Sequence, residues 1–347
     1  MPIIDLLLQE SVGAYPSDMD WQALRQQQYA WIDVAKESNL PNMVNKDKLK
    51  NSWGLPGTKI PVMGKNKPTI QDGGMGCDFG DLEARAQYVS VTFVEKFFNL
   101  DMIPAETDQS QLTYAQVFAQ KMRDLEEAAA DYLETAVHNI VDTNKATAYN
   151  SGFVGATKRY PLASDALQVG NAFSNRFFND LQAIMFADDF AGKDITVIGD
   201  AQLPAEVSYY EQQGRGNTAN LSYQFSPYDF RASRSTVTSG GANVLATGFA
   251  VPANTIGYVS RIDGDSLRRE ASTTGIQWDT FKSDFLGIDM MIKYKSDCAD
   301  VTARTLNPLD LGRFKEQWKI GFSVAIFTVW DDSQLNTGIK KFDILSV

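Results

Sequence analysis

The sequence has very few of the residues on which most catalytic and metal sites depend. Its 347 residues include a single histidine, His138, and 2 cysteines, Cys77 and Cys298, which are far apart and lack CxxC spacing. It contains no HExxH zinc motif, no G-x-S-x-G motif and no sign of a Ser-His-Asp triad. Two distant cysteines argue against a secreted disulfide scaffold and favour a reducing compartment. We therefore expect no catalytic residues, no metal site and no cofactor.

Long apolar runs and an excess of basic residues are also absent. No apolar stretch approaches the length of about 20 residues that a membrane span needs. The start, MPIIDLLLQESVG, lacks the basic flank of a signal peptide. The formal net charge is -11, from 43 acidic and 32 basic side chains. A free-standing nucleic-acid-binding protein needs a basic face to release counterions, so this charge disfavours that class. The composition, 44% hydrophobic and 22% charged, is that of a globular protein.

The longest regular pattern covers residues 112–141, which we interpret as one uninterrupted helix. The run contains no Gly or Pro, and Thr113 can cap its start with Gln116 as the capping-box partner. At 1.5 Å per residue such a helix is about 45 Å long. Apolar residues recur at steps of three and four, which places them on one buried face. The residues predicted on this face are Tyr114, Phe118, Met122, Leu125, Ala129, Leu133, Ala136 and Ile140.

Residues 1–45 are interpreted as an arm that carries one helix. Ser17 and Asp18 can cap this helix, and Pro41 closes it. Trp21 and Trp31 lie within it at helical spacing and make a large apolar load for a short element. These tryptophans can pack on the chain's own core or dock on a neighbouring subunit, and the sequence leaves both possibilities open.

Residues 46–87 are rich in lysine, proline and glycine, and we predict a protruding, glycine-hinged hairpin or loop. Only a short strand fits, around residues 59–62, because proline cannot donate to a strand ladder. The lysines of this segment contrast with carboxylates on the long helix, and the two sets could pair within one subunit or between neighbours. Single surface pairs contribute about 0–1 kcal/mol, so they would set register and partner choice more than affinity. The two sets are Lys59, Lys65 and Lys67, and Glu126, Glu127, Asp131 and Glu134.

The remainder of the chain predicts a mixture of strands and helices. Residues 214–250 are rich in Gly, Ser, Thr and Asn and resemble an exposed loop region more than a core. Helices are predicted at 174–190 and 203–213, and strands at 88–98, 194–198, 251–262, 286–294, 320–330 and 338–345.

In this order the parts resemble the HK97-like major capsid protein of tailed, double-stranded-DNA bacteriophages. WGLPGTKIPVMG is similar to the entry into the extended loop of that family, and YVSVTFVEKFF to the strand that returns from it. Residues 112–141 resemble the spine helix, and the helix–strand–helix around DITVI resembles the axial domain. The strands from Ile320 and Gly338 resemble the closing sheet of the peripheral domain.

The resemblance implies an α+β, HK97-like capsid fold with an N-terminal arm, an extended loop, a peripheral domain and an axial domain. The corresponding ranges are 1–45 for the arm, 46–87 for the loop, 88–165 with 286–347 for the peripheral domain, and 166–285 for the axial domain. In this family the loop overlaps an adjacent subunit and the arm reaches neighbours. The residues expected at subunit interfaces are Trp21, Trp31, Lys59, Lys65, Lys67, Glu126, Glu127, Asp131 and Glu134.

The function that the resemblance implies is assembly with further copies of the same chain, not catalysis. Hexamers and pentamers would form an icosahedral phage head that encloses double-stranded DNA without sequence-specific binding. The expected partners are other copies of the chain and portal, scaffold and decoration proteins, with no membrane. The expected location is the virion capsid, after assembly in the host cytoplasm.

Three other interpretations remain open at this point. An encapsulin-type nanocompartment shell would share the fold and enclose cargo enzymes. An unrelated α/β enzyme would use the glycine-rich run at residues 73–80 and bind a nucleotide as a monomer or small oligomer. Another virion component, such as a tail or neck protein, would form rings or tubes.

Overall fold

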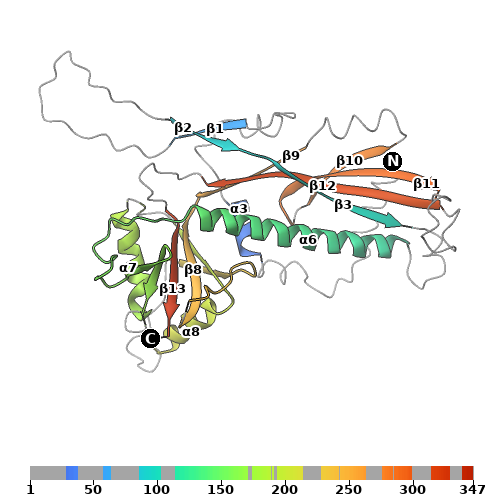
Figure 1. Ribbon diagram of the computed structural model, residues 1–347. Coiled ribbons are helices and arrows are strands. Elements are labelled where there is room, and N and C mark those ends of the chain that lie inside the picture. The colour runs from blue at the N-terminus through green and yellow to red at the C-terminus, as the bar shows by residue number, and fades with distance from the viewer. Residues whose placement is uncertain are drawn as a thin grey trace, which may run out of the picture.

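The structure is a computed structural model of the chain. It describes residues 29–37, 58–63, 86–102, 114–170, 174–188, 190, 194–213, 228–241, 243–262, 276–283, 285–298, 314–328 and 338–346. Two sheets, each with its own core, are connected by the long helix α6 (Tyr114–Thr143), as Figure 1 shows. The predicted α+β class is confirmed. No helix in these ranges is both long enough and apolar enough to cross a membrane.

The first sheet is antiparallel and is built around β12 (Phe314–Thr328). Its strand order is β10 (Gln277–Ser283), β11 (Ile288–Cys298), β12 and β3 (Val94–Met102), and β9 (Ile256–Arg261) also pairs with β12. β11 pairs with residues 314–322 of β12 and β9 with residues 323–328, along the edge opposite β3. The strand predicted from residue 320 therefore begins earlier, at Phe314.

One face of the first sheet is covered by the first two thirds of α6. Alternate residues of β12, including Trp318, Ile320 and Phe322, point toward the helix, as the period of two in a strand requires. The helix contributes apolar residues at its own period of 3.6. The α6 residues that are buried in this core are Phe118, Met122, Leu125, Ala129, Ala130 and Leu133.

The buried side of α6 changes beyond Leu133. Ala136 and Ile140, predicted on the buried face, are only half-buried, whereas Val137 and Val141 are fully buried. These two valines pack against α3 (Ala30–Glu37) and the second sheet and not against the first. Beyond Leu133, the buried apolar stripe of α6 therefore follows other residues than predicted, because the helix packs against a different part of the subunit there.

The second sheet is mixed and has helices on one face. Its strand order is β4 (Leu162–Ala163), β5 (Ala166–Val169), β13 (Lys340–Leu345), β8 (Val244–Pro252), β6 (Ile195–Gly199) and β7 (Tyr228–Ala232). The β13–β5 and β6–β7 pairs are parallel. α7 (Ser174–Ala187) and α8 (Leu203–Gln213) cover one face with Phe177, Leu181 and Leu203 among others. Ile198, Phe249 and Val251 project from the opposite face toward α3 and α6.

Two predicted sheet memberships are wrong. The strand at 338–345 was expected beside the strand from residue 320, but β13 lies in the second sheet between β5 and β8. Residues 256–283 were expected in the axial domain, but β9 and β10 pair with β12 and β11 in the first sheet. Strand partners are chosen by long-range packing, which a strand's own sequence does not encode.

The predicted loop at 214–250 and the predicted strand at 88–98 also differ from the structure. β7 and β8 lie within the former, and β8 is a central strand whose residues from Ala246 on are buried. Its small residues are buried on both faces, so no alternation of polar and apolar residues marks it. The strand at 88–98 divides into β2 (Ala86–Val91) and β3, which belong to different sheets.

β2 pairs with β1 (Thr58–Met63) in a separate, antiparallel two-stranded sheet. The register runs from Thr58 opposite Val91 to Met63 opposite Ala86. This confirms the short strand predicted at 59–62. Trp21, Lys65, Lys67 and the glycine-rich run at 73–80 lie outside the described residues, and for Lys59 only the backbone is described.

The core position of Leu133 generates a stability prediction. Leu133→Ala should lower the free energy of unfolding by about 2–5 kcal/mol, because a fully buried leucine leaves a cavity between α6 and the first sheet. Gln120→Ala, at an exposed position of the same helix, should change it by less than about 0.5 kcal/mol. Urea denaturation measures both, and equal effects would contradict the assignment of Leu133 to the core.

Candidate functional site

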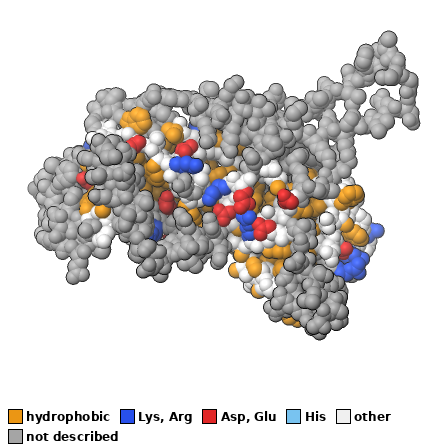
Figure 2. Space-filling model, turned by 180° about the vertical axis from the view of Figure 1, so that it is seen from behind, with side chains coloured by type: hydrophobic (Ala, Val, Ile, Leu, Met, Phe, Trp, Pro, Cys, Tyr) orange, Lys and Arg blue, Asp and Glu red, His pale blue; other side chains and the backbone are white. Residues whose placement is uncertain are grey.

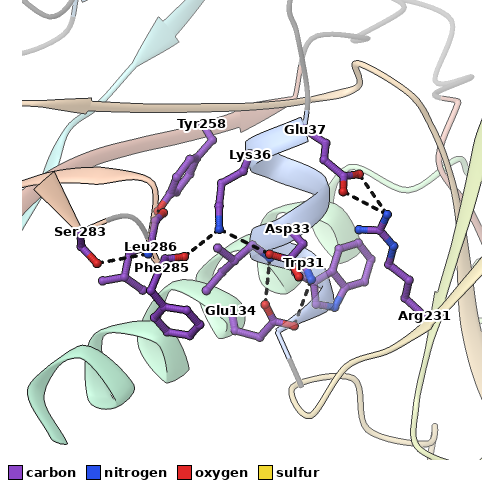
Figure 3. A network of polar contacts seen from close by, with 11 residues as sticks. Trp31, Asp33, Lys36, Glu37, Glu134, Arg231, Tyr258, Ser283, Phe285 and Leu286 are labelled. Carbon is purple, nitrogen blue, oxygen red and sulfur yellow. Dashed lines mark hydrogen bonds and ion pairs between the residues drawn. The ribbon is translucent and has the colours of Figure 1, made fainter. Parts of the chain in front are cut away.

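The described residues contain no group of three or more His, Cys, Asp or Glu side chains that could hold a metal ion. A dense set of polar contacts instead surrounds the short helix α3, where it lies between α6 and both sheets (Figure 3). We call this region the α3 junction: α3 itself together with Glu134, Arg231, Ser233, Thr236 and Phe285, which bind it. Three of the sequence-predicted interface residues, Trp31, Asp131 and Glu134, lie in it or directly beside it.

Glu134 of α6 binds the N-terminal end of α3. Its Oε1 accepts a hydrogen bond from the backbone N–H of Trp31 at 3.1 Å, and its Oε2 accepts one from Ile32 at 3.0 Å. The Ser233 hydroxyl donates a third hydrogen bond to Oε1 at 2.6 Å. The first N–H groups of a helix have no partner within the helix, and the helix dipole places partial positive charge there. Glu134 therefore caps α3 from a different helix.

The protein shields this carboxyl from water. Glu134 is 1% exposed, and burial raises its pKa to about 7 because water no longer stabilises the charged form. The hydrogen bonds from Ser233, Trp31 and Ile32 act in the opposite direction and favour the ionised form. The balance leaves a carboxyl that changes its charge close to neutral pH.

Trp31 fixes the same end of α3 through its side chain. The residue is completely buried, and its indole N–H donates a hydrogen bond to the Thr236 hydroxyl at 3.0 Å. Its ring lies 5.6 Å from Phe249 and 5.9 Å from His138. Burial lowers the pKa of His138, the single histidine of the chain. The possibility left open for Trp31 is thereby decided in favour of the chain's own core.

The C-terminal half of α3 contacts both sheets. Lys36 Nζ donates a hydrogen bond at 2.7 Å to the carbonyl of Phe285, in the turn between β10 and β11 of the first sheet. Arg231 on β7 of the second sheet binds both carboxylate oxygens of Glu37, at 3.0 and 3.1 Å. Figure 3 shows these contacts on the two sides of α3, with Glu134 below it. One short helix thus ties the two sheets to each other.

The four carboxylates predicted on α6 have different surroundings. Glu126 accepts a hydrogen bond from the Ser283 hydroxyl at 2.9 Å, so it is engaged within the subunit, as Glu134 is. Glu127 is exposed. Asp131 is exposed but accepts a hydrogen bond from the Tyr29 hydroxyl at 3.1 Å, and Arg234 lies 3.8 Å away. Glu127 and Asp131 are therefore the members of the set that remain on the surface.

Sequence reasoning missed most partners of α3. Arg231, Ser233 and Thr236 belong to a stretch that was predicted to be an exposed loop. Isolated serine, threonine and arginine residues without periodicity carry no signal for a buried contact. The only available hint was Glu134 itself, a carboxyl one helical turn from apolar positions on both sides.

A second buried charge, also missed, lies at the far side of the second sheet. Lys340 of β13 forms an ion pair with Asp188 after α7 at 2.6 Å, and neither side chain is exposed. Asp188 also accepts a hydrogen bond from the backbone N–H of Asn150 at 2.8 Å. The ammonium group lies 4.5 Å from the ring centre of Tyr149. Burial lowers the pKa of Lys340, and Asp188 opposes that change. The arrangement is structural, since it ties β13 to α7.

Charged and apolar side chains alternate on the surface. Figure 2 shows acidic and basic side chains interspersed across the middle of one face, with hydrophobic side chains on both sides of them. Among the residues that the structure describes, the large hydrophobic side chains that are exposed are Val94, Phe97, Tyr132, Leu162, Phe186, Tyr209, Val237 and Trp278.

Comparison with known proteins gives similarity in chain path only. No protein-family model matches the sequence, and no curated protein sequence is similar to it. A structure titled Mycobacterium phage Che8 has a TM-score of 0.49 and 11% identity, over 88% of this chain and 90% of that one. The capsid structure of the cyanophage P-SCSP1u has a TM-score of 0.47 and 10% identity, over 84% of each chain. The asymmetric unit of the bacteriophage PhiM1 mature capsid has a TM-score of 0.42 and 11% identity, over 84% of this chain and 83% of that one. We draw no conclusion about residue roles from them.

The elements of the chain itself decide the architecture. A hairpin precedes a 30-residue helix that crosses an antiparallel sheet, and a second, mixed sheet with two flanking helices follows. This α+β arrangement around a long helix is the one that the resemblance to HK97-like capsid proteins led us to expect.

Removal of the Glu134 carboxyl should weaken the α3 junction. Glu134→Ala leaves two buried N–H groups and the Ser233 hydroxyl without their acceptor, so the free energy of unfolding should fall by about 1–3 kcal/mol. Glu127→Ala, on the exposed side of the same helix, should have little effect. Chemical denaturation compares the two variants, and equal losses would contradict a specific role for Glu134.

The Lys340–Asp188 pair generates a second expectation. Lys340→Met should cost about 3–5 kcal/mol, because the carboxylate of Asp188 is left buried without its counter-charge. Adding Asp188→Asn should restore part of that loss, since it removes the stranded charge. A double-mutant cycle by urea denaturation measures the coupling. Purely additive effects would show that the two groups do not interact.

Proposed function

We propose that this chain is the major capsid protein of a tailed, double-stranded-DNA bacteriophage. The observation that carries the proposal is the β1–β2 hairpin, which stands outside both larger sheets in Figure 1. An isolated two-stranded hairpin is at best marginally stable in water and needs further strands or a surface to pack on. A hairpin of this kind on a spine-helix subunit supports docking on a neighbouring copy, in hexamers and pentamers of an icosahedral head.

The edge of β3 that faces away from β12 supports the same conclusion. In the part of the chain that the structure describes, β3 pairs only with β12, through nine consecutive residues from Val94 to Met102. The strand contains no proline, glycine or bulge, and Val94 and Phe97 are 43% and 59% exposed. Edge strands without proline or a bulge are templates for pairing with another chain, and the charged side chains of Glu95 and Lys96 restrict which chain can pair here. In a shell, this edge lies within reach of contacts between copies.

Charge contributes the register between neighbouring subunits. In our proposal, Lys59, Lys65 and Lys67 on the loop of one copy face Glu127 and Asp131 on the spine helix of the next. Glu126 and Glu134 leave the original set because they are bound within their own subunit and are not exposed, whereas Asp131 is exposed although it accepts a hydrogen bond from Tyr29. Trp21 stays in the proposal as a contact of the arm with a neighbour, whereas Trp31 serves the subunit's own core.

The remaining partners follow from the role. Portal, scaffold and decoration proteins join the shell, which is assembled in the host cytoplasm and becomes the virion capsid. The net charge of -11 suits a wall that encloses DNA without binding its sequence, because a basic lining would attract phosphates. The chain acts as a structural protein and performs no catalysis. An encapsulin-type shell has the same fold, and electron microscopy of particles with and without packaged DNA separates the two.

Assembly tests the proposal and the charge pairing separately. Purified protein should form closed shells or capsomers in electron microscopy, and a strictly monomeric protein at high concentration would contradict the capsid role. Lys59→Glu with Lys65→Glu and Lys67→Glu should weaken assembly at unchanged circular dichroism, because like charges then meet across the interface.

Two controls complete this experiment. Lys158→Glu with Arg176→Glu and Lys282→Glu makes the same change in net charge at exposed positions away from the loop, and it should assemble normally. Glu127→Lys with Asp131→Lys should restore assembly of the loop variant. Unchanged shells in the loop variant would contradict the charge pairing and leave the capsid role intact.

A further inference from the structure

α3 occupies the joint between the two sheets of the subunit. Its apolar residues Trp31, Val34 and Ala35 share one core with Val137 and Val141 of α6 and with Phe249 of β8. Its polar ends reach the β10–β11 turn through Lys36 and β7 through Glu37. Any change in the position of α3 therefore acts on both sheets at once.

Glu134 holds the N-terminal end of α3 through its carboxyl group. Within the described ranges no ion pair includes it. The charged groups around it are Asp33, Lys36 and Glu37 of α3, Asp131 and His138 of α6, and Arg231 and Arg234 at the end of β7. The nearby cations have other carboxylates, in the pairs Lys36–Asp33, Arg231–Glu37, Arg231–Asp229 and Arg234–Asp131. A buried carboxylate without a counter-charge is costly, even with three hydrogen-bond donors.

We propose that α3 is a latch that holds the two sheets of the subunit together and that loss of the Glu134 proton loosens this latch. Release of α3 exposes the carboxyl to water, where its charge is stabilised. The docked state therefore binds the proton more tightly than the released state does. This property belongs to the single subunit and does not depend on the capsid role.

The direction of the pH dependence follows from the two states. The pKa of Glu134 is raised by burial from an ordinary 4.5 to about 7, so docking is strongest below pH 4.5 and weakens as pH rises through 7. For these values, the equilibrium constant for docking falls about 30-fold between pH 5.5 and pH 8.0. Burial also raises the pKa of Asp33, which acts in the same direction at lower pH. The lowered pKa of His138 acts in the opposite direction, because docking then weakens as pH falls.

Hydrogen exchange of the full chain, read by mass spectrometry at pH 5.5 and 8.0 and corrected for the intrinsic exchange rate, tests the latch. The peptide covering residues 29–37 should lose more protection at pH 8.0 in the parent protein than in Glu134→Gln. For each protein, the protection factor of this peptide at pH 5.5 is divided by that at pH 8.0. This quotient should be about 30 times larger in the parent than in Glu134→Gln. His138 is present in both proteins, so its contribution cancels. The segments 285–287 and 231–236, one in each sheet, should change together with α3, because α3 holds both.

Two further variants sharpen the result. Glu127→Gln removes an exposed carboxyl of the same helix and should behave as the parent does. Ser233→Ala keeps the Glu134 carboxyl but removes a donor that favours its charged form, so the loss of protection at pH 8.0 should increase. An identical pH response in the parent and in Glu134→Gln would overturn the proposal. An equal change in a β12 peptide would also overturn it, since exchange would then report unfolding of the whole subunit.

Discussion

The packing of one long helix against two different sheets is the constraint on which the remaining structure depends. A straight helix of 30 residues extends about 45 Å, which is longer than one small sheet can cover. The first part of α6 buries Phe118 and Leu133 on the first sheet, and the last part buries Val137 and Val141 on α3 and the second sheet. The helix therefore contributes side chains to a core on each sheet, so the same element connects the two halves of the subunit.

The region where the helix passes from one sheet to the other needs an additional element, and α3 provides it. Its 8 residues are too few to form a stable helix in isolation. It is held by a cap from Glu134, by the buried ring of Trp31 and by ionic contacts at its C-terminal end. A helix that depends on its surroundings to this extent responds to changes in them, and this is the physical basis of the latch. The same dependence explains why Glu134, on the most regular helix of the chain, is not available to a neighbouring subunit.

Local pattern was a reliable guide where an element has a clear hydrophobic period or clear end signals in its own sequence. The long helix α6, α8 and the short strand β6 were predicted close to their observed bounds, because each has a clear period or clear end signals. Prediction failed for strands that are buried on both faces of a sheet. β8, with its run of small residues, was assigned to a loop, and its neighbour β13 was assigned to the other sheet. In both cases the strand's partner lies far away in the sequence, so no window of adjacent residues contains the information.

The sequence by itself determined the α+β class, the long helix and its apolar stripe, the separation of a basic loop from acidic helix residues, and the scarcity of catalytic side chains. These properties depend on composition and on periods of two or 3.6 residues. Tertiary structure alone decided which carboxylates form hydrogen bonds within the subunit and which sheet each strand joins. It also decided that α3 packs between the two sheets. Those outcomes depend on contacts between residues about a hundred positions apart, as in the bond from Trp31 to Glu134, and such contacts leave no trace in local spacing.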